Sequence, residues 1–510
     1  MPHSYIKKIL NARVYDVARE TPLDAAPLLS SRLNNQVWLK REDLQPVFSF
    51  KCRGAYNKMS RLDESARQAG VVAASAGNHA QGVALAAQKL SIKATIVMPV
   101  TTPAIKVDAV RARGARVALF GDTFDEAAVR AAELVATHGL TFIHPFDDPD
   151  VIAGQGTVAM ELVRQAPGPL DYVFICCGGG GLLAGMAAYL RYTWPDTRII
   201  GVEPEDAACT QAALNEGRRV TLREVGLFAD GCAVAQVGKE TFRVIRECVD
   251  EVMTVSTDEI CAAVKDIFED TRAIAEPAGA LAVAGMKKFA EAHAITGKMM
   301  AATVSGANTN FDRLRYISER TEIGERREAI LSVTIPERAG AFRTFCSAIG
   351  KRNITEFNYR YEMSGEARVF VGLTVTPDDE GVSALQSVLE RKGYRVLDMT
   401  DNETAKLHLR HMIGGRVSPE IADEMVFRVE FPERPGSLLQ FLDALGKEFS
   451  ISLFHYRNHG SAFGRILVGM QVPPSKRPML KKALSRLGYR FWEETDNPAY
   501  REYLGRPTTG

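Results

Sequence analysis

The sequence predicts an α/β protein in which a body of two parallel β-sheets is followed by two copies of a smaller α+β module. Three observations support this prediction. Short β-rich runs alternate with Ala-rich helical stretches up to about residue 304, the alternation resets near Ala153–Gly156, and a sequence repeat begins near residue 328. Strands and helices in alternation indicate a parallel sheet covered by helices on both faces.

The strands of the body are expected where β-branched and small apolar residues cluster. In chain order the expected elements are a strand at 71–74, a helix at 80–90, a strand at 94–98, a helix at about 104–113, a strand at 115–120, a helix at about 124–138, and strands at 172–176 and 198–202 with a helix between them. The reset near Ala153–Gly156 divides these elements between two sheets. The cleft between the sheets is the expected ligand site.

The repeat near the C-terminus indicates a duplicated structural unit. Ile335–Gly340 (IPERAG) recurs as Phe431–Gly436 (FPERPG), and Gly393–Arg395 recurs as Gly488–Arg490, both GYR. Ordered matches at a nearly constant offset identify an internal repeat. Each copy has the order strand, Gly turn, helix, strand, strand, helix, strand, which is typical of a ferredoxin-like βαββαβ module. Such a pair could be structural, a dimerisation surface or a sensor.

The predicted domain boundaries follow from this organisation. The body is expected at 1–320, the first module at 328–405 and the second module at 422–505. Residues 410–419 contain two adjacent glycines and a proline, which predicts a linker between the modules.

Composition narrows the class of protein. The 510 residues carry a net charge of +1, with 46% hydrophobic and 25% charged residues, which is ordinary for a soluble globular protein. This charge gives no electrostatic footprint for nucleic acid or an anionic membrane. No apolar run approaches the roughly 20 residues that span a bilayer, and the N-terminus lacks the apolar region of a signal peptide.

The cysteines indicate the redox state of the cellular compartment, and the histidines indicate whether a metal site is expected. The eight cysteines are scattered without a C-x-x-C pair, which predicts free, mostly buried thiols in a reducing cytoplasm. The pairs His408/His411 and His455/His459 have neither a nearby Cys nor an H-E-x-x-H pattern. The sequence therefore predicts a cytoplasmic protein without a metal site.

Lys51 is the most informative residue for function because of its neighbours. It lies in Ser49–Gly54 (SFKCRG), and the small-residue loop Ser75–His79 (SAGNH) follows one strand later. An amine in a partly apolar segment can lose its proton and form a Schiff base with a carbonyl. A loop with exposed backbone N–H groups can hold a carboxylate. Together they indicate an enzyme that carries pyridoxal phosphate on a lysine and acts on an amino acid.

Four consecutive glycines predict a phosphate site. Gly178–Gly181 follows the strand at 172–176 and precedes an apolar helix. Glycines let the backbone approach an anion closely, and the N-terminus of the helix favours negative charge. The same stretch also fits the dinucleotide fingerprint G-x-G-x-x-A, with Glu203 at the end of the next strand placed for a ribose. The loop alone leaves pyridoxal phosphate and a nicotinamide dinucleotide as alternatives, and Lys51 and Ser305 favour pyridoxal phosphate.

Three further polar residues are candidates for the site. Ser305 follows a short strand, where its hydroxyl can hydrogen-bond a ring nitrogen without protonating it. Asn78 precedes a helix and could donate to a ring hydroxyl, capture a carboxylate or cap the helix. Glu276 has two interpretations: it could be a residue of the site, or it could be an acidic residue that stabilises the first turn of a helix.

These motifs resemble those of the fold-type-II pyridoxal-phosphate enzymes of the serine/threonine dehydratase family. They appear here as 49–56 (SFKCRGAY), 74–82 (ASAGNHAQG), 178–181 (GGGG), 275–280 (AEPAGA) and 305–308 (SGAN). The segment 311–316 (FDRLRY) and the doubled module extend the resemblance to essentially the whole chain. It implies a tryptophan synthase β-like body followed by two ACT-like regulatory domains.

The resemblance also implies roles for individual residues. Lys51 would be the catalytic residue, Asn78 would meet the ring 3-hydroxyl, and Ser305 the pyridine nitrogen. The implied cofactor-binding set is Phe50, Lys51, Asn78, Gly178, Gly179, Gly180, Gly181, Leu182 and Ser305. The implied substrate-binding set is Ser75, Ala76, Gly77, Asn78 and His79.

The activity implied by the resemblance is the dehydration and deamination of L-threonine to 2-oxobutanoate and ammonia. Serine dehydratase, or another fold-type-II β-eliminase, is the alternative within this class. The family further implies isoleucine as a feedback inhibitor and valine as an opposing activator, both acting through the C-terminal domains, and a homotetramer. From other classes, a nicotinamide-dependent oxidoreductase and an amino-acid sensor with an inactive body stay open.

Overall fold

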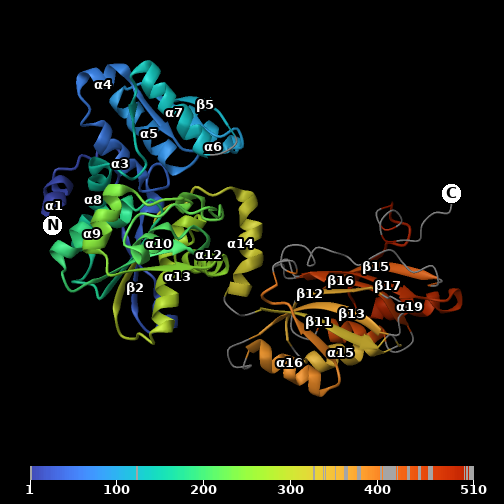
Figure 1. Cartoon of the computed structure of the whole chain (residues 1–510). Coiled ribbons are helices and arrows are strands. Elements are labelled where there is room, and N and C mark those ends of the chain that lie inside the picture. The colour runs from blue at the N-terminus through green and yellow to red at the C-terminus, as the bar shows by residue number, and fades with distance from the viewer. Residues whose placement is uncertain are drawn as a thin grey trace. The chain divides into compact units, whose positions relative to one another are not determined.

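The chain forms two compact units, Met1–Gly324 and Glu325–Gly510. The computed structural model describes residues 3–121 and 124–324 of the first unit (Figure 1). Of the second unit it describes 328–336, 338, 340–350, 352–360, 366–375, 381–402, 405, 421, 423–432, 437–445, 449–457, 463–486, 488–498, 500 and 504. The predicted linker at 410–419, the boundary at 422 and the turn at 433–436 lie outside the described residues.

One half of the first unit is built on a four-stranded parallel sheet of order β5-β4-β3-β6. Its strands are β3 (Val71–Ala74), β4 (Ala94–Met98), β5 (Arg116–Leu119) and β6 (Thr141–Phe142). The helices of this part of the chain are α3 (Lys51–Met59), α4 (Glu64–Ala69), α5 (Asn78–Leu90), α6 (Ala104–Arg111) and α7 (Phe124–His138). The predicted alternation of strands and helices is therefore confirmed here.

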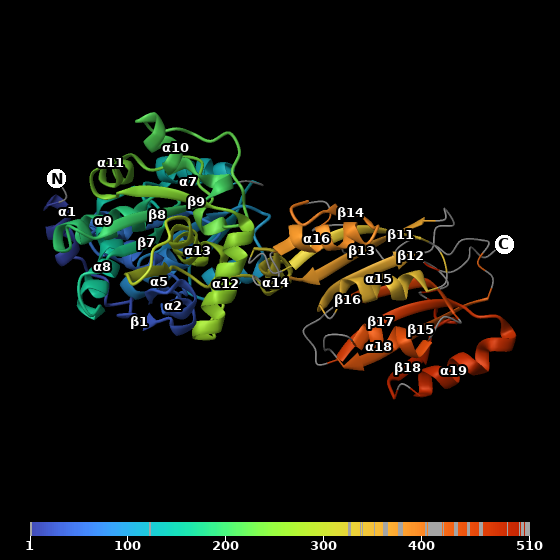
Figure 2. The same ribbon diagram turned by 90° about the horizontal axis from the view of Figure 1, so that it is seen from below.

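The other half contains a six-stranded sheet of order β1-β2-β10-β7-β8-β9, parallel except for β1 (Figure 2). Its strands are β1 (Leu23–Ala25), β2 (Gln36–Arg41), β7 (Tyr172–Cys176), β8 (Arg198–Pro204), β9 (Glu251–Val255) and β10 (Met299–Val304). Its helices are α1 (His3–Leu10), α2 (Pro27–Leu33), α8 (Pro149–Gln165), α9 (Gly181–Thr193), α10 (Cys209–Glu216), α11 (Lys239–Cys248), α12 (Thr257–Thr271), α13 (Pro277–Ala292) and α14 (Phe311–Gly324), with 3₁₀ turns η1 (Glu42–Leu44), η2 (Glu205–Ala207) and η3 (Asp230–Cys232).

The reset that the sequence analysis placed near Ala153–Gly156 lies inside α8. The helix continues through its glycines, which allow it to pack closely against neighbouring helices. A Cβ on Gly154 would lie 2.7 Å from the Arg53 carbonyl oxygen, and a Cβ on Gly156 would lie 2.9 Å from the Gly185 carbonyl oxygen. These close approaches fix α8 against α3 and α9, so α8 connects the two sheets of the unit.

Several helix starts carry the expected capping chemistry. Asp148 accepts hydrogen bonds from the backbone N–H groups of Asp150 and Val151 at the start of α8. Ser256 and Glu259 form a reciprocal capping box at the start of α12. Such bonds satisfy backbone donors that have no partner within the helix.

The second unit is one eight-stranded antiparallel sheet of order β14-β11-β13-β12-β16-β17-β15-β18. The first copy has β11 (Glu328–Pro336), α15 (Ala341–Ile349), β12 (Ile354–Arg360), β13 (Glu366–Thr374), α16 (Gly381–Arg391) and β14 (Arg395–Asp398). The second has β15 (Glu424–Pro432), α18 (Ser437–Leu445), β16 (Ser450–Arg457), β17 (Phe463–Gln471), η6 (Pro474–Lys476), α19 (Arg477–Arg486) and β18 (Arg490–Glu493). Both copies have the predicted βαββαβ order, and they join through antiparallel β12 and β16.

All eight cysteines are free and buried, as predicted. Among the helices that the structure describes, none combines the length and the apolar character needed to cross a bilayer.

Candidate active site

Lys51 is the first residue of α3, and the chain before it is attached to the end of β10. Ser49 pairs with Gly306 in an isolated antiparallel bridge, and the Phe50 N–H donates to the Ser305 carbonyl oxygen at 3.4 Å. Lys51 Nζ donates to the Pro145 carbonyl oxygen at 2.9 Å. Burial lowers the pKa of the Lys51 amine. The structure thus holds a readily deprotonated amine between the two sheets.

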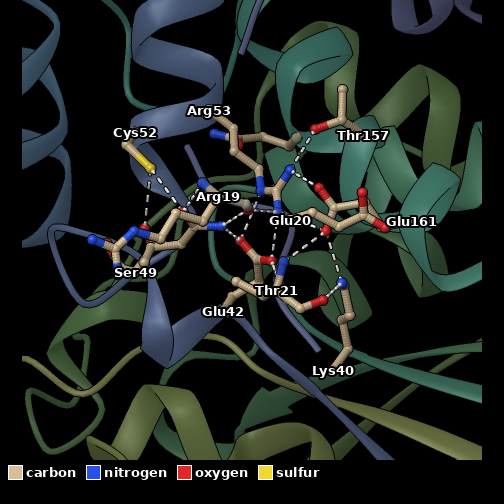
Figure 3. A network of polar contacts seen from close by, with 12 residues as sticks. Arg19, Glu20, Thr21, Lys40, Glu42, Ser49, Cys52, Arg53, Thr157 and Glu161 are labelled. Carbon is tan, nitrogen blue, oxygen red and sulfur yellow. Dashed lines mark hydrogen bonds and ion pairs between the residues drawn. The ribbon is translucent and has the colours of Figure 1, made fainter. Parts of the chain in front are cut away.

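A buried ionic cluster anchors α3 behind Lys51 (Figure 3). The Arg53 guanidinium donates to Glu42 at 2.8 Å and to Glu161 at 2.6 Å, and Lys40 Nζ donates to Glu161 at 2.7 Å. All four side chains are fully buried. The cluster ties α3 to η1, β2 and α8, and so fixes where the helix begins.

Lys40 is a second lysine whose pKa burial lowers, and its surroundings distinguish it from Lys51. Its amine is occupied by Glu161, by the Gln165 side chain at 3.0 Å and by the Thr21 carbonyl oxygen at 2.5 Å. It does not line the cavity that contains Lys51. Lys40 is therefore a structural ion-pair partner, and Lys51 is the amine open to chemistry.

One cavity brings all of the predicted cofactor residues together. Its lining includes every member of the predicted cofactor set, namely Phe50, Lys51, Asn78, Gly178, Gly179, Gly180, Gly181, Leu182 and Ser305. The glycines lead directly into α9, whose N-terminal N–H groups favour an anion. Gly180 has a φ of +91°, a conformation that favours glycine. This cradle, a lysine and a serine hydroxyl suit a phosphorylated aldehyde cofactor such as pyridoxal phosphate.

The loop has no room for a side chain at Gly179. A Cβ there would lie 2.2 Å from the Phe146 ring, which also lines the cavity. We expect Gly179→Ala to weaken binding of pyridoxal phosphate to the apoenzyme by roughly tenfold to a hundredfold, since overpacking costs about 1–3 kcal/mol. Absorbance titration measures the Kd. Gly168→Ala is the matched control because Gly168 has open space around it, and equal affinities of the two variants would contradict the assigned cradle.

Ser305 and Asn78 face this cavity from opposite parts of the unit. Ser305 follows β10 and is buried, and its hydroxyl donates to the Ala278 carbonyl oxygen at 3.3 Å. Asn78 opens α5, where its side chain amide donates to Glu276 and does not cap the helix. The two residues come from different sheets, so a cofactor between them would be held by both halves of the unit.

The predicted substrate loop lies beside the cavity but, apart from Asn78, does not line it. It follows the carboxyl end of β3, and the Gly77 N–H donates to Ser75 Oγ at 3.2 Å. His79 is buried, with Nε2 at 2.8 Å from the Ile143 carbonyl oxygen. Burial and nearby Lys51 lower the pKa of His79 to about 3, so its ring is neutral at physiological pH. The assignment of Ser75, Ala76, Gly77 and His79 to the substrate stays a prediction.

Glu203, the acid of the dinucleotide alternative, has another role. It is fully buried at the end of β8, and its carboxylate accepts from the backbone N–H groups of Thr210 and Gln211 at 2.9 Å each. These bonds place it at the start of α10 and leave it away from the cavity. This carboxylate is therefore not placed for the ribose contact that a dinucleotide fingerprint requires.

Comparison with known proteins agrees with this site. The family model described as pyridoxal-phosphate dependent enzyme matches residues 14–306. The model for the C-terminal regulatory domain of threonine dehydratase matches residues 319–409 and 415–504. This chain belongs to the threonine dehydratase family. It is a pyridoxal-phosphate-dependent lyase with regulatory domains, and the predicted fold class and cofactor are confirmed.

Members of the threonine dehydratase family match along the whole chain. The biosynthetic L-threonine dehydratase IlvA of Burkholderia multivorans is 53% identical over 505 residues, covering 98% of this chain and 99% of that protein. The enzyme of the same name from Escherichia coli is 51% identical over 500 residues, with 98% and 97% covered. The structure of processed threonine deaminase isoform 2 from Solanum lycopersicum is 50% identical with a TM-score of 0.62, covering 62% of this chain and 93% of that one.

Sequence reasoning missed several residues that line the cavity. Phe146, Gly231 and Cys232 come from segments far from the recognised motifs, and Ala278 lies within the motif 275–280 but was given no role. Cys176 directly precedes the glycine loop, and its position at the end of a predicted strand was the one available signal. A hydrogen bond with Cys232 lowers the pKa of Cys176, so the two thiols form a polar pair in the cavity wall.

Proposed function

We propose that this enzyme converts L-threonine to 2-oxobutanoate and ammonia as the first step of isoleucine biosynthesis. The observation that carries the proposal is the placement of Lys51, with its lowered pKa, in one cavity with the glycine cradle and Ser305. The threonine dehydratase names of relatives that match 98% of this chain support the same substrate.

The residues of the cavity and of the neighbouring Ser75–Gly77 loop have separate roles in a β-elimination. Pyridoxal phosphate, when bound, supplies an electron sink for the bond broken at Cα. Lys51 holds the cofactor, and its amine takes the Cα proton because burial favours its neutral form. Backbone N–H groups of the Ser75–Gly77 loop bind the substrate carboxylate. Ser305 offers a neutral hydroxyl to the ring nitrogen, which favours elimination over transamination.

The test of this function is product analysis. Purified enzyme supplied with L-threonine or L-serine should release ammonia with 2-oxobutanoate or pyruvate, respectively. We expect the higher kcat/KM with threonine. A preference for serine would make the enzyme a serine dehydratase, and the absence of both keto acids would contradict the proposal.

The regulatory function is assigned to a cavity within the second unit. This cavity is lined by residues of both copies, including Gly340, Ala341 and Phe342 from the first and Leu442 and Leu445 from the second. Gly340 has a φ of +86° and precedes α15, whose N-terminus suits a carboxylate. We propose that isoleucine inhibits, and valine activates, by binding in this cavity. At the equivalent turn of the second copy, Leu438 and Leu439 do not line the cavity, and Gly436 lies outside the described residues.

A large side chain that fills this cavity should make the activity of the enzyme less sensitive to inhibition by isoleucine. We expect Ala341→Trp to raise the isoleucine concentration for half-inhibition by roughly 5–150-fold, the usual range of allosteric coupling, and to leave activity without effector unchanged. Ser383→Trp on the exposed part of α16 is the control. Inhibition curves that coincide for Ala341→Trp and wild type would place the effector elsewhere.

We also propose that the enzyme is a cytoplasmic homotetramer. Free buried cysteines suit a reducing compartment. Light scattering of the purified enzyme measures its mass, and a monomer of 55.9 kDa would contradict the tetramer.

A further inference from the structure

Glu276 is a buried acid that has no assigned role in the proposed reaction. It precedes α13, where an acidic side chain often stabilises the helix N-terminus. Its carboxylate makes no capping bond, and the side chain lines the cavity with Lys51 and Ser305. The residue is only 3% exposed, and a Cβ on Gly306 would lie 2.3 Å from Oε1, so the carboxylate packs against the backbone beside Ser305. The Glu276 carboxylate therefore contributes to the wall of the cavity and does not cap α13.

Glu276 is one of two groups that orient the Asn78 amide. Asn78 Nδ2 donates to Glu276 Oε1 at 2.6 Å, and Asn78 Oδ1 accepts from Asn308 Nδ2 at 2.6 Å. Asn308 is itself held, because the same nitrogen donates to the Val47 carbonyl oxygen at 2.8 Å. An ionised carboxylate can only accept, and an amide nitrogen can only donate. A flipped Asn78 amide would therefore lose both bonds.

We propose that Glu276 is a positioning residue: with Asn308, it holds the Asn78 amide as a hydrogen-bond donor toward the cofactor cavity. Nδ2 carries two hydrogens and gives one to Glu276, which leaves the second for the ring oxygen that Asn78 is expected to meet. A donor there favours a ring oxygen that has lost its proton. The expected effect on kcat rests on the proposed function, whereas the expected effect on the cofactor spectrum does not.

The electrostatic surroundings of Glu276 make its hydrogen bond with Asn78 sensitive to pH. Burial, and then the charge of Asp230, raise the pKa of Glu276 to about 7. Asp230 is paired with Lys106 at 2.7 Å, and Lys51 and Cys176 also face the carboxyl group. Glu276 is protonated below this pH and ionised above it. Because charged acceptors form stronger hydrogen bonds, Asn78 is held more firmly on the alkaline side.

Three variants of the holoenzyme test the proposal. Glu276→Gln keeps an acceptor for Asn78 but cannot ionise, Glu276→Ala removes the acceptor, and Asn308→Ala removes the bond on the other side of the amide. The control is Glu203→Gln, since Glu203 is equally buried and burial raises its pKa to about 7, but it does not line the cavity. For each we measure the absorbance spectrum of the bound cofactor against pH, its Kd, and kcat and KM for threonine.

The expected results separate positioning from stability. Glu276→Ala and Asn308→Ala should shift the cofactor spectrum and lower kcat by roughly a hundredfold with a smaller change in KM, as misplaced groups do. The wild-type spectrum should change near pH 7, where Glu276 ionises. Glu276→Gln should retain kcat within about tenfold at pH 7, and its spectrum should not change there. Glu203→Gln should keep the wild-type spectrum.

Two outcomes would overturn the proposal. One is a wild-type spectrum and pH response in Glu276→Gln; the other is an unshifted spectrum in Asn308→Ala, which remains informative if Glu276→Ala does not fold. Wild-type enzyme that binds the cofactor but does not turn over threonine would reject the proposed function alone, because the spectral comparison does not depend on the substrate.

Discussion

Replacing Lys51 by alanine is expected to abolish turnover and the absorbance band of the lysine-bound cofactor together. The amine is the attachment point and the base, so both functions are lost in one change. Loss of the base alone lowers rates by roughly 10²–10⁴-fold. Keto-acid release from threonine and an absorbance spectrum of the purified variant measure the two effects.

The control for this variant is Lys58→Ala. Lys58 lies on the same helix, and its amine pairs with Asp148 at 2.8 Å near the surface. It should retain the spectrum and nearly all of the activity. Turnover by Lys51→Ala comparable with that of Lys58→Ala would show that another residue performs the chemistry.

Removing the Arg53 guanidinium is expected to give the largest loss of stability. Arg53→Met keeps most of the side-chain volume but leaves Glu42 without its guanidinium partner and leaves Lys40 as the remaining ion-pair partner of Glu161. Breaking a buried ion pair in this way costs about 3–5 kcal/mol. Urea unfolding at pH 7, followed by circular dichroism, measures the free energy of unfolding of the first unit.

Two comparisons identify the cause of that loss. Arg61→Met, in the turn that follows α3, removes a partly exposed arginine 4.0 Å from Asp150 and should cost less than about 1 kcal/mol. Adding Glu42→Gln to Arg53→Met removes the orphaned charge and should recover part of the stability. If the double variant is as unstable as the sum of the single changes, packing and not charge is the dominant contribution.

Much of the fold could be predicted because its signals are local. The strands at 71–74, 94–98 and 172–176 and the helix at 124–138 were predicted with the bounds that the structure has. Alternating strands and helices have strong periodicity, and the repeated IPERAG-type turn marks equivalent points of the two modules. The position of the glycine loop between β7 and α9 was predictable for the same reason, because four adjacent glycines after a strand are a local pattern.

The remaining features depend on contacts between distant segments. Gly154 and Gly156 were interpreted as the point where the alternation resets, but nothing in the sequence shows that they pack against Gly54 and Gly185. The joining of the two modules through β12 and β16 was not predicted either, because strand pairing across a repeat leaves no periodic signal. Glu276 left two interpretations open, and its hydrogen bond to Asn78 distinguishes them.

The most direct test is to reduce the holoenzyme with borohydride and map the labelled peptide by mass spectrometry. A pyridoxyl group on Lys51, in the peptide that contains SFKCRG, is the predicted result. A label on Lys40, the other buried lysine with a lowered pKa, or no labelled lysine at all, would contradict the assignment of the active site.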